Sequence, residues 1–264
     1  MKRITTLVIL ILAMAAGATA QQSRWSVFAG WNLAVGPYGT VGDNAGDWAL
    51  TSAQSDRGGA GFGSDLGVSY RYRFGDSSDF GIVFNAEYLY SSVCMKIKTD
   101  NLMSVFNQQT NCGVGKISNP GFHTVPFLGG IFFETGLKED RYKLYFDLQA
   151  GVTISCISDY EVEFRGASSP IVVDGTYYTD YCFTNDYQTK AVPAFRFGVG
   201  LLGNKHVALD MSLLCLAQIV VRGTQEYDYT YAWGGTASQR AGKMDFIAGT
   251  ITPMYLTFRI GYNF

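Results

Sequence analysis

Few side chains in this sequence have the types and spacing that catalysis requires. Histidine occurs only at positions 123 and 206, which excludes a metal site built from several histidines. His123 is followed by Thr124 but lacks serine and glutamate neighbours in a catalytic pattern. Gly198, Gly200 and Gly203 match GxGxxG by letter, yet the segment reads as a strand and turn and opens no helix, so it lacks phosphate-binding geometry. We therefore expect no catalytic residue, metal or cofactor.

A second set of residues is charged. They lie in segments where apolar and polar residues alternate, and they occupy the polar positions, on the face of the segment away from the apolar residues. An unpaired charge in an enclosed space is costly, whereas paired charges with further hydrogen bonds can be accommodated. If these segments enclose an interior, the balance of five acidic and five basic groups predicts that ion pairs fill and close it. The alternative is that the interior is a narrow or gated channel. The residues are Asp65, Arg71, Arg73, Glu87, Glu134, Lys143, Asp147, Arg196, Asp210 and Arg259.

Four of the five cysteines bracket long connecting segments. Cys94 and Cys112 flank one, and Cys156 and Cys182 flank the next. Because export to an oxidising compartment permits disulfides, we expect Cys94–Cys112 and Cys156–Cys182. In an anaerobic environment the thiols would instead stay reduced. Cys215 is spaced by two and four residues from the apolar Leu213 and Met211, so it lies on the same face as these residues. If that face contacts lipid, Cys215 is expected to remain a free thiol facing lipid.

Two long segments carry unusual side chains. Residues 158–188 hold six acidic groups against Arg165 alone. Hard cations bind several oxygen ligands, but these acids lack EF-hand spacing, so a solvated acidic surface is favoured over a cation site. Residues 223–248 contain an alternating aromatic run from Tyr227 to Trp233. That run predicts a hairpin that extends the wall of the fold, with a partner-binding patch as the alternative.

The elements that must position these groups are β-strands. From Met254 to Phe264 apolar side chains occupy every second position, with polar side chains between them. A period of two places these sets on opposite faces of a strand. The same alternation recurs seven more times along the chain. The segments are 24–34, Phe62–Phe74, Phe80–Tyr90, Thr124–Glu134, Tyr142–Ile154, Phe195–Leu201 and Val207–Ile219.

The connections between these strands alternate strictly between long and short. Segments 75–79, 136–140 and 203–205 are tight turns with Gly, Asp or Asn, residues that adopt turn conformations readily. The long connections are 35–59, 93–120, 158–188 and 223–248. Short periplasmic turns and long extracellular loops are typical of outer-membrane barrels. The pattern predicts an all-β fold, an eight-stranded antiparallel transmembrane β-barrel. A secreted soluble barrel or sandwich, with its apolar face inward, is the alternative.

The ends and composition agree with export. Lys2 and Arg3, an apolar run and the Ala18-Thr19-Ala20 cleavage pattern predict a signal peptide over residues 1–20, leaving the barrel domain as residues 21–264. No later segment approaches the ~18 apolar residues of a spanning helix. A net charge of −2 argues against a nucleic-acid surface, which is normally basic.

On the strand pattern and the aromatic terminal residue, the chain resembles small outer-membrane β-barrel proteins of the OmpA/OmpX type. More loosely, it resembles the barrel-domain proteins common in Bacteroidetes. The resemblance implies residence in the bacterial outer membrane, contact with its lipid, and insertion by the outer-membrane assembly machinery with Phe264 as recognition signal. Some small barrels modify lipid A acyl chains with His and Ser at the outer rim, and His123 is the nearest counterpart.

These features predict a non-enzymatic barrel, monomeric or weakly associated, with a charge-plugged interior. Its role would be structural, or surface interaction with an unidentified extracellular partner through the four long loops. The first alternative is a narrow channel for small or hydrophobic solutes, and the second is an outer-rim lipid A acyl-modifying enzyme.

Overall fold

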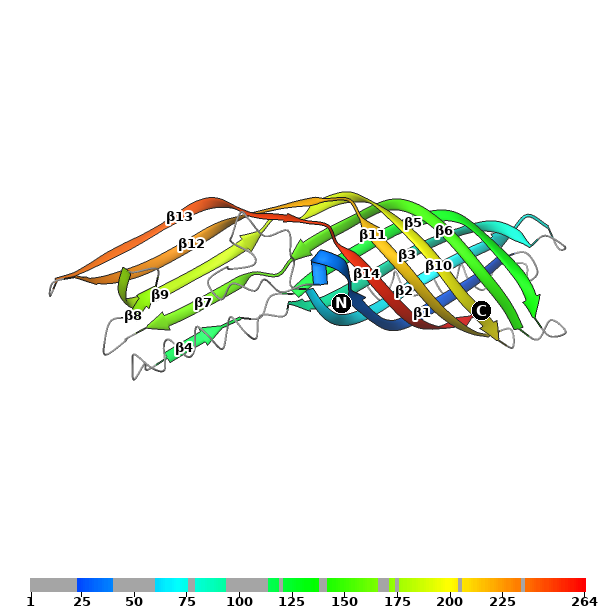
Figure 1. The fold of residues 1–264 in the computed structure, drawn as a ribbon, viewed down its shortest axis with the longest axis horizontal. Helices are drawn as coiled ribbons and strands as arrows, with labels where there is room; N and C mark the ends of the chain where they lie inside the picture. The colour runs from blue at the N-terminus through cyan, green and yellow to red at the C-terminus, as the bar shows by residue number, and fades with distance from the viewer. Residues whose placement is uncertain are drawn as a thin grey trace, which may run out of the picture.

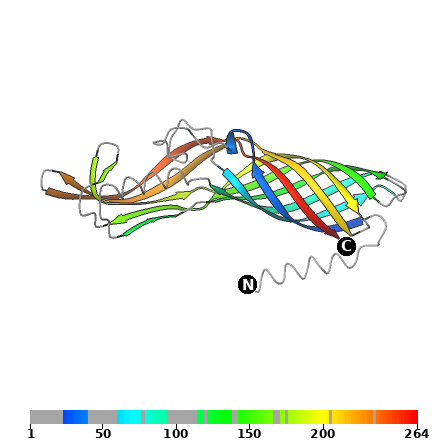
Figure 2. The same ribbon diagram turned by 60° about the horizontal axis from the view of Figure 1, so that its bottom comes forward.

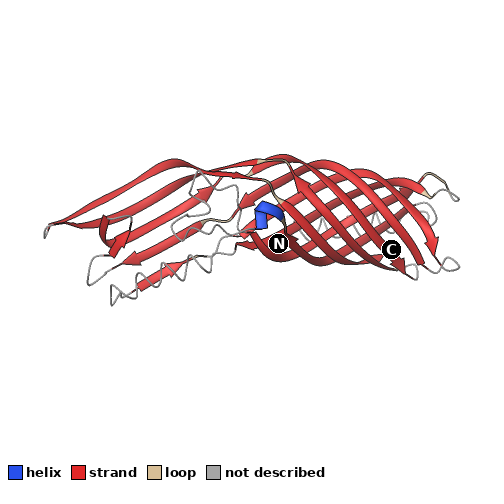
Figure 3. Cartoon of the chain, viewed as in Figure 1, coloured by secondary structure: helices blue, strands red, loops and turns tan. Residues whose placement is uncertain are grey.

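The computed structural model describes residues 23–39, 60–75, 79–93, 114–118, 121–137, 142–165, 171–173, 176–203, 206–233 and 236–264. These residues form strands, with one short 3-10 helix, η1 (Gly36–Gly39), as Figure 3 shows. Within these ranges no helix is long and apolar enough to cross a membrane. The expected signal peptide, Cys94 and Cys112 lie outside the described residues.

Eight strands close into an antiparallel barrel in the order β1-β14-β11-β10-β6-β5-β3-β2. Closure comes from β1 pairing with β14, from Ser26 opposite Asn263 to Ala34 opposite Tyr255. The predicted eight-stranded, all-β fold is therefore confirmed. The strands are β1 (Ser23–Ala34), β2 (Ala60–Arg73), β3 (Phe80–Val93), β5 (Gly121–Leu137), β6 (Tyr142–Ile157), β10 (Lys190–Gly203), β11 (Val207–Leu216) and β14 (Met254–Asn263).

The seventh predicted segment crosses the boundary between two strands. The seventh segment was expected to run to Ile219, but β11 ends at Leu216 and Ile219 begins another strand. At this level the main chain bonds to carbonyls of proline residues: Leu216 N–H to Pro253 at 2.9 Å and Ala217 N–H to Pro193 at 2.8 Å. Because proline has no N–H to donate, a regular ladder is interrupted there, and the chain passes from the barrel into a second sheet.

The outer surface of the barrel is apolar. Each barrel strand contributes an outward side chain that is between 49% and 57% exposed, and the polar residues between them are buried. This arrangement is the reverse of a soluble barrel and matches a wall that contacts lipid. It rules out the soluble alternative. Representative outward residues are Trp31, Leu66, Phe84, Ile131, Leu148, Phe197, Leu209 and Ile260.

A second sheet, here called the outer sheet, extends beyond the barrel at the end opposite the carboxyl terminus (Figures 1 and 2). Its order is β13-β12-β9-β7-β4, with β8 paired to β9. The strands are β4 (Val114–Ile117), β7 (Tyr160–Arg165), β8 (Ile171–Val173), β9 (Thr176–Tyr187), β12 (Ile219–Trp233) and β13 (Thr236–Ile251). The aromatic hairpin predicted within 223–248 is confirmed by β12 and β13. Residues 158–188, expected as an acidic loop, are instead largely strands.

Candidate functional site

Two buried arginines occupy the middle of the barrel, where β10 and β14 direct them inward. Arg196 Nη2 lies 3.0 Å from Asp210 Oδ1, and its Nη1 pairs with Glu87. Arg259 Nη1 lies 2.6 Å from Glu87 Oε1, its Nε lies 2.8 Å from Asp210 Oδ1, and Asp65 Oδ2 is 3.7 Å from the same Nε. All five residues are at most 5% exposed. We call them the charge network.

Three inward residues of β2 and β6 join the charge network from one side. Arg71 Nη2 lies 3.6 Å from Asp147 Oδ2, and its guanidinium carbon lies 3.8 Å from the centre of the Tyr145 ring. The Tyr145 hydroxyl donates to Asp210 at 2.7 Å. Gly198 leaves space for these groups, because an added Cβ would lie 2.6 Å from Asp147 Oδ1. Gly198, the first glycine of the GxGxxG letters, therefore serves interior packing.

The remaining predicted charges lie toward the end of the barrel near the carboxyl terminus. Arg73 pairs with buried Glu134, whereas Lys143 is only partly buried. Arg24, which sequence reasoning missed, also reaches Glu134 at 3.6 Å. Its signal was available, since Arg24 shares strand parity with the polar, inward Ser26 and Asn32. All ten predicted charged residues thus lie on the inner face of the barrel.

A second, largely apolar layer fills the barrel where it meets the outer sheet. The helix η1 places Tyr38, which is fully buried, so that its hydroxyl lies 2.8 Å from that of Tyr255. Tyr255 also contacts Thr124 Oγ1 at 3.0 Å, and the rings of Tyr38 and Phe122 pack with centroids 5.0 Å apart. We call this layer the apolar seal. It comprises Tyr38, Leu89, Phe122, Leu128, Leu214 and Tyr255.

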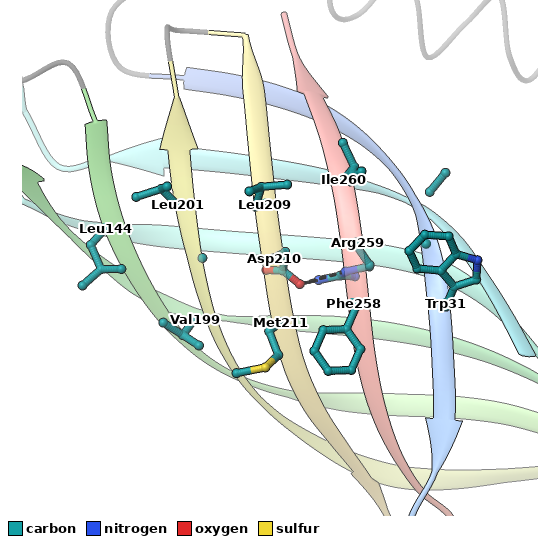
Figure 4. A pocket seen from close by; sticks show the side chains of 13 residues that line it. Trp31, Leu144, Val199, Leu201, Leu209, Asp210, Met211, Phe258, Arg259 and Ile260 are labelled. Atoms are coloured by element: carbon teal, nitrogen blue, oxygen red, sulfur yellow. Dashed lines mark hydrogen bonds and ion pairs between the residues drawn. The ribbon is translucent and has the colours of Figure 1, made fainter. Parts of the chain in front are cut away.

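A shallow hollow of about 910 Å³ lies on the lipid-facing side of the wall. Figure 4 shows Trp31, Leu209, Met211 and Phe258 around it, with the Asp210–Arg259 contact on a different side of the same strands. Ala29, small and on the same outward face as Trp31, also lines the hollow. Because its exposed lining is apolar, the hollow suits hydrocarbon chains of the membrane.

The structure brings together a cluster at the outer rim that the sequence did not predict. Ser158 Oγ lies 3.0 Å from His123 Nε2, and the Tyr88 hydroxyl lies 2.6 Å from His123 Nδ1. The Ser158 hydroxyl also accepts from the Gly121 N–H at 3.0 Å. A serine beside a histidine whose other nitrogen is held by a third group is the arrangement of an activated nucleophile. We call these residues the rim cluster.

The expected disulfide between Cys156 and Cys182 was wrong, because both cysteines are free. Cys182 on β9 lies opposite Glu163 of β7, which follows Cys156 by seven residues. Seven residues of extended chain span roughly 23 Å, far beyond the Cα separation of ~7 Å that a disulfide tolerates. Cys215 is also free, as expected.

The two faces of the outer sheet differ in chemistry. On one face Tyr181 stacks on Tyr229 with ring centroids 4.9 Å apart, and Tyr227 stacks on Tyr229 at 5.1 Å. Tyr178 lies 5.0 Å from both Tyr181 and Tyr231. Burial, followed by the neighbouring phenols, raises the pKa of Tyr229 to about 12, so the Tyr229 hydroxyl is uncharged at neutral pH.

The opposite face of the outer sheet is charged, and several of its charges form pairs. Lys116 Nζ lies 2.9 Å from Glu161 Oε2, and Arg165 Nε lies 2.9 Å from Glu163 Oε1. Among the described residues no group of three His, Cys, Asp or Glu side chains could hold a metal ion. The acidic residues of 158–188 that lie on this face therefore form part of a mixed-charge surface.

No family model and no curated protein matches this sequence. Among solved structures, the chain is similar to the outer membrane protein OprG from Pseudomonas aeruginosa, with a TM-score of 0.41, 11% identity, and coverage of 92% of this chain and 97% of that chain. It is also similar to a major outer membrane protein from Thermus thermophilus, with a TM-score of 0.46, 9% identity, and coverage of 92% of this chain and 99% of that chain. For the attachment invasion locus protein Ail of Yersinia pestis, the TM-score is 0.34 and the identity 13%, with coverage of 92% of this chain and 99% of that chain.

The closed barrel, its apolar outer wall and its charge-filled interior define a small outer-membrane β-barrel protein. It resides in the bacterial outer membrane. Since the carboxyl terminus lies at the end opposite the outer sheet, the outer sheet stands on the side of the long connections, which face the cell exterior in such proteins.

Proposed function

We propose that this protein is a closed, non-enzymatic barrel that anchors the outer sheet outside the cell as an interaction surface. The observation that carries the proposal is the filled interior: the charge network and the apolar seal are two successive buried layers across the barrel. In an eight-stranded barrel the interior is just wide enough for side chains to fill it. Among the described residues, the outer sheet then remains as the part that offers a surface to a partner.

Single-channel recording tests the closed barrel. The refolded protein, checked by its heat-dependent gel shift, is expected to give no discrete conductance steps in a planar bilayer. An open porin added afterwards to the same bilayer controls for sensitivity. Discrete steps from the folded protein alone would overturn the proposal and favour the narrow channel for small or hydrophobic solutes.

The rim cluster is the specific observation that favours a second candidate, an acyl-ester hydrolase or acyl-modifying enzyme at the outer rim. Ser158 Oγ would attack the ester carbonyl, and the ester C–O bond would break to leave an acyl-serine and an alcohol. His123 would accept the serine proton and pass it to the leaving alcohol, and Tyr88 would orient the imidazole. Against this, the Ser158 hydroxyl already bonds to the Gly121 N–H, and the third group is a phenol where an acid would normally orient the histidine.

A fluorophosphonate probe separates the two candidates. The closed, non-enzymatic barrel predicts no covalent labelling of the folded protein. Labelling that is lost in Ser158→Ala and His123→Ala, but retained in Ser92→Ala, would establish the hydrolase. Ser92 is a matched control because it is an exposed serine on β3, where its hydroxyl bonds to the Phe62 carbonyl.

Two further partners remain part of the proposal. Membrane lipid would cover the outward side chains and the hollow beside Trp31. The outer-membrane assembly machinery would recognise the carboxyl-terminal strand with Phe264, whose N–H bonds to the Trp25 carbonyl at 2.9 Å in the closed barrel.

A further inference from the structure

The outer sheet ends in a long edge strand, β13. It runs for 16 residues and pairs with β12 on one side, while within the described part of the chain no strand pairs with its other side. From position 237 to 245 its side chains are exposed on both faces. Long exposed edges are normally blunted, because their unpaired main-chain groups are ready to bond another strand.

The usual protections are weak along this edge. The strand contains no proline, and its bulge lies near the barrel, opposite Val221 and Arg222. Its two cations are directed to β12: Lys243 Nζ lies 2.6 Å from Glu226 Oε1, and Arg240 lies over the Tyr227 ring at 5.9 Å. The main-chain groups of β13 are therefore accessible to an added strand.

The sequence of β13 is complementary to itself in one antiparallel register. A twofold axis through Met244 places Lys243 of each copy opposite Asp245 of the other copy, which gives two pairs of opposite charges. It also places Gly242 opposite Phe246, so a residue without a side chain faces the largest side chain of this segment. An axis through Lys243 or through Asp245 would instead oppose like charges, which is destabilising. Axes through Ala241 or Gly242 form no charge pair.

We propose that the partner of the outer sheet is a second copy of this chain, joined edge to edge through antiparallel β13 strands and anchored in a facing membrane. The inference rests on the proposed role of the outer sheet as an interaction surface, and it names the partner. Two copies in one membrane point their β13 strands the same way. A twofold axis along the membrane normal would then bring Lys243 beside Lys243 of the second copy, and this contact between like charges disfavours pairing within one membrane.

The length of β13 allows this facing geometry. Met244 precedes Met254, the start of the barrel strand β14, by ten residues, which at ~3.3 Å per residue is about 33 Å. The two barrel rims would therefore stand about 65 Å apart. Thr236, at the far end of β13, would reach about 26 Å beyond the axis and stop short of the opposite rim.

Charge reversal tests the pairing. Each full-length variant is placed singly in lipid nanodiscs, which leave both membrane faces accessible, and association is measured by sedimentation. Wild-type discs are expected to dimerise. In K243D the new aspartate faces Asp245 of the second copy, and in D245K the new lysine faces Lys243. Each variant alone should therefore associate at least about tenfold more weakly than wild type. Mixing K243D discs with D245K discs restores both opposite-charge pairs and should restore dimers.

The matched control is K116D, which makes the same charge change at β4 near the other edge of the outer sheet and should dimerise like wild type. Electron micrographs of the dimers should show face-to-face discs with about 65 Å between them. The proposal is overturned if wild-type discs stay single, if K243D dimerises normally, or if the mixture of K243D and D245K stays single. The association measurements do not depend on whether the barrel conducts ions. A failure of the dimer proposal can therefore be distinguished from a failure of the closed-barrel proposal.

Discussion

Replacing Arg259 with methionine is expected to lower the free energy of unfolding by about 3–5 kcal/mol. The guanidinium contacts both Glu87 and Asp210 inside the barrel, and methionine would leave these carboxylates with Arg196 as their main counter-charge. An uncompensated buried charge is far more costly than the loss of a surface pair. Urea-dependent unfolding in lipid, followed by tryptophan fluorescence, measures the change.

The control for this variant is Lys143→Met, which removes a positive charge from the same inner face where it is only partly buried. Its effect should stay within about 0.5 kcal/mol. A wild-type free energy of unfolding for Arg259→Met would show that the charge network does not stabilise the barrel, and the structural reading of the interior would fail.

Replacing Tyr38 with alanine is expected to destabilise the barrel by about 3 kcal/mol, because a fully buried ring is removed from the apolar seal. Tyr38→Phe should cost about 1 kcal/mol, since Tyr255 keeps its contact with Thr124 at 3.0 Å. Both values are obtained from the same urea titrations, and their difference separates packing from the hydrogen bond.

The Tyr38→Ala variant also reports on closure. The charge network lies below the apolar seal and contains no residue of η1, so the variant should still give no conductance steps in a planar bilayer. Steady conductance from Tyr38→Ala would show that the seal alone closes the barrel. Equal stability of Tyr38→Ala and wild type would show that η1 does not pack in the barrel in the membrane.

The barrel was predictable because its signal is local. Apolar and polar residues alternate along strands such as Met254–Phe264, and that period depends on no distant contact. The parity of the alternation also placed residues such as Arg196 and Asp210 on the inner face. The particular ion pairs were not predictable, because they depend on the register between strands that are far apart in sequence.

The outer sheet was partly hidden by composition. Glu161, Glu163 and Arg165 alternate with Val162 and Phe164, a strand pattern that the density of acidic residues masked. In β7 the charged residues are partly or fully exposed while Val162 and Phe164 are buried, so the acids indicate one side of a sheet rather than a loop. The hairpin was found because its alternating tyrosines have no such competing signal.

Two other features had no signal in the sequence. Tyr38 lies in a short helical turn without periodicity, and its burial depends on how η1 folds over the mouth of the barrel. Ser158 meets His123 only because β5 and β6 pair with Phe122 opposite Ile157. Neither contact follows from residue type or spacing, since each is set by tertiary arrangement.

The continuity of the strands gives the outer sheet a mechanical property. Four short breaks, at residues 158–159, 188–189, 217–218 and 252–253, separate strands of the outer sheet from strands of the barrel. A pull on the sheet along its strands is therefore carried by the backbone into several barrel strands at once. Because the hydrogen bonds of antiparallel ladders lie across the strands, such a force loads many bonds together in shear and does not peel them one by one. The barrel would thus distribute tension over its wall, which is the property that the proposed contact between two facing membranes needs when the membranes move apart.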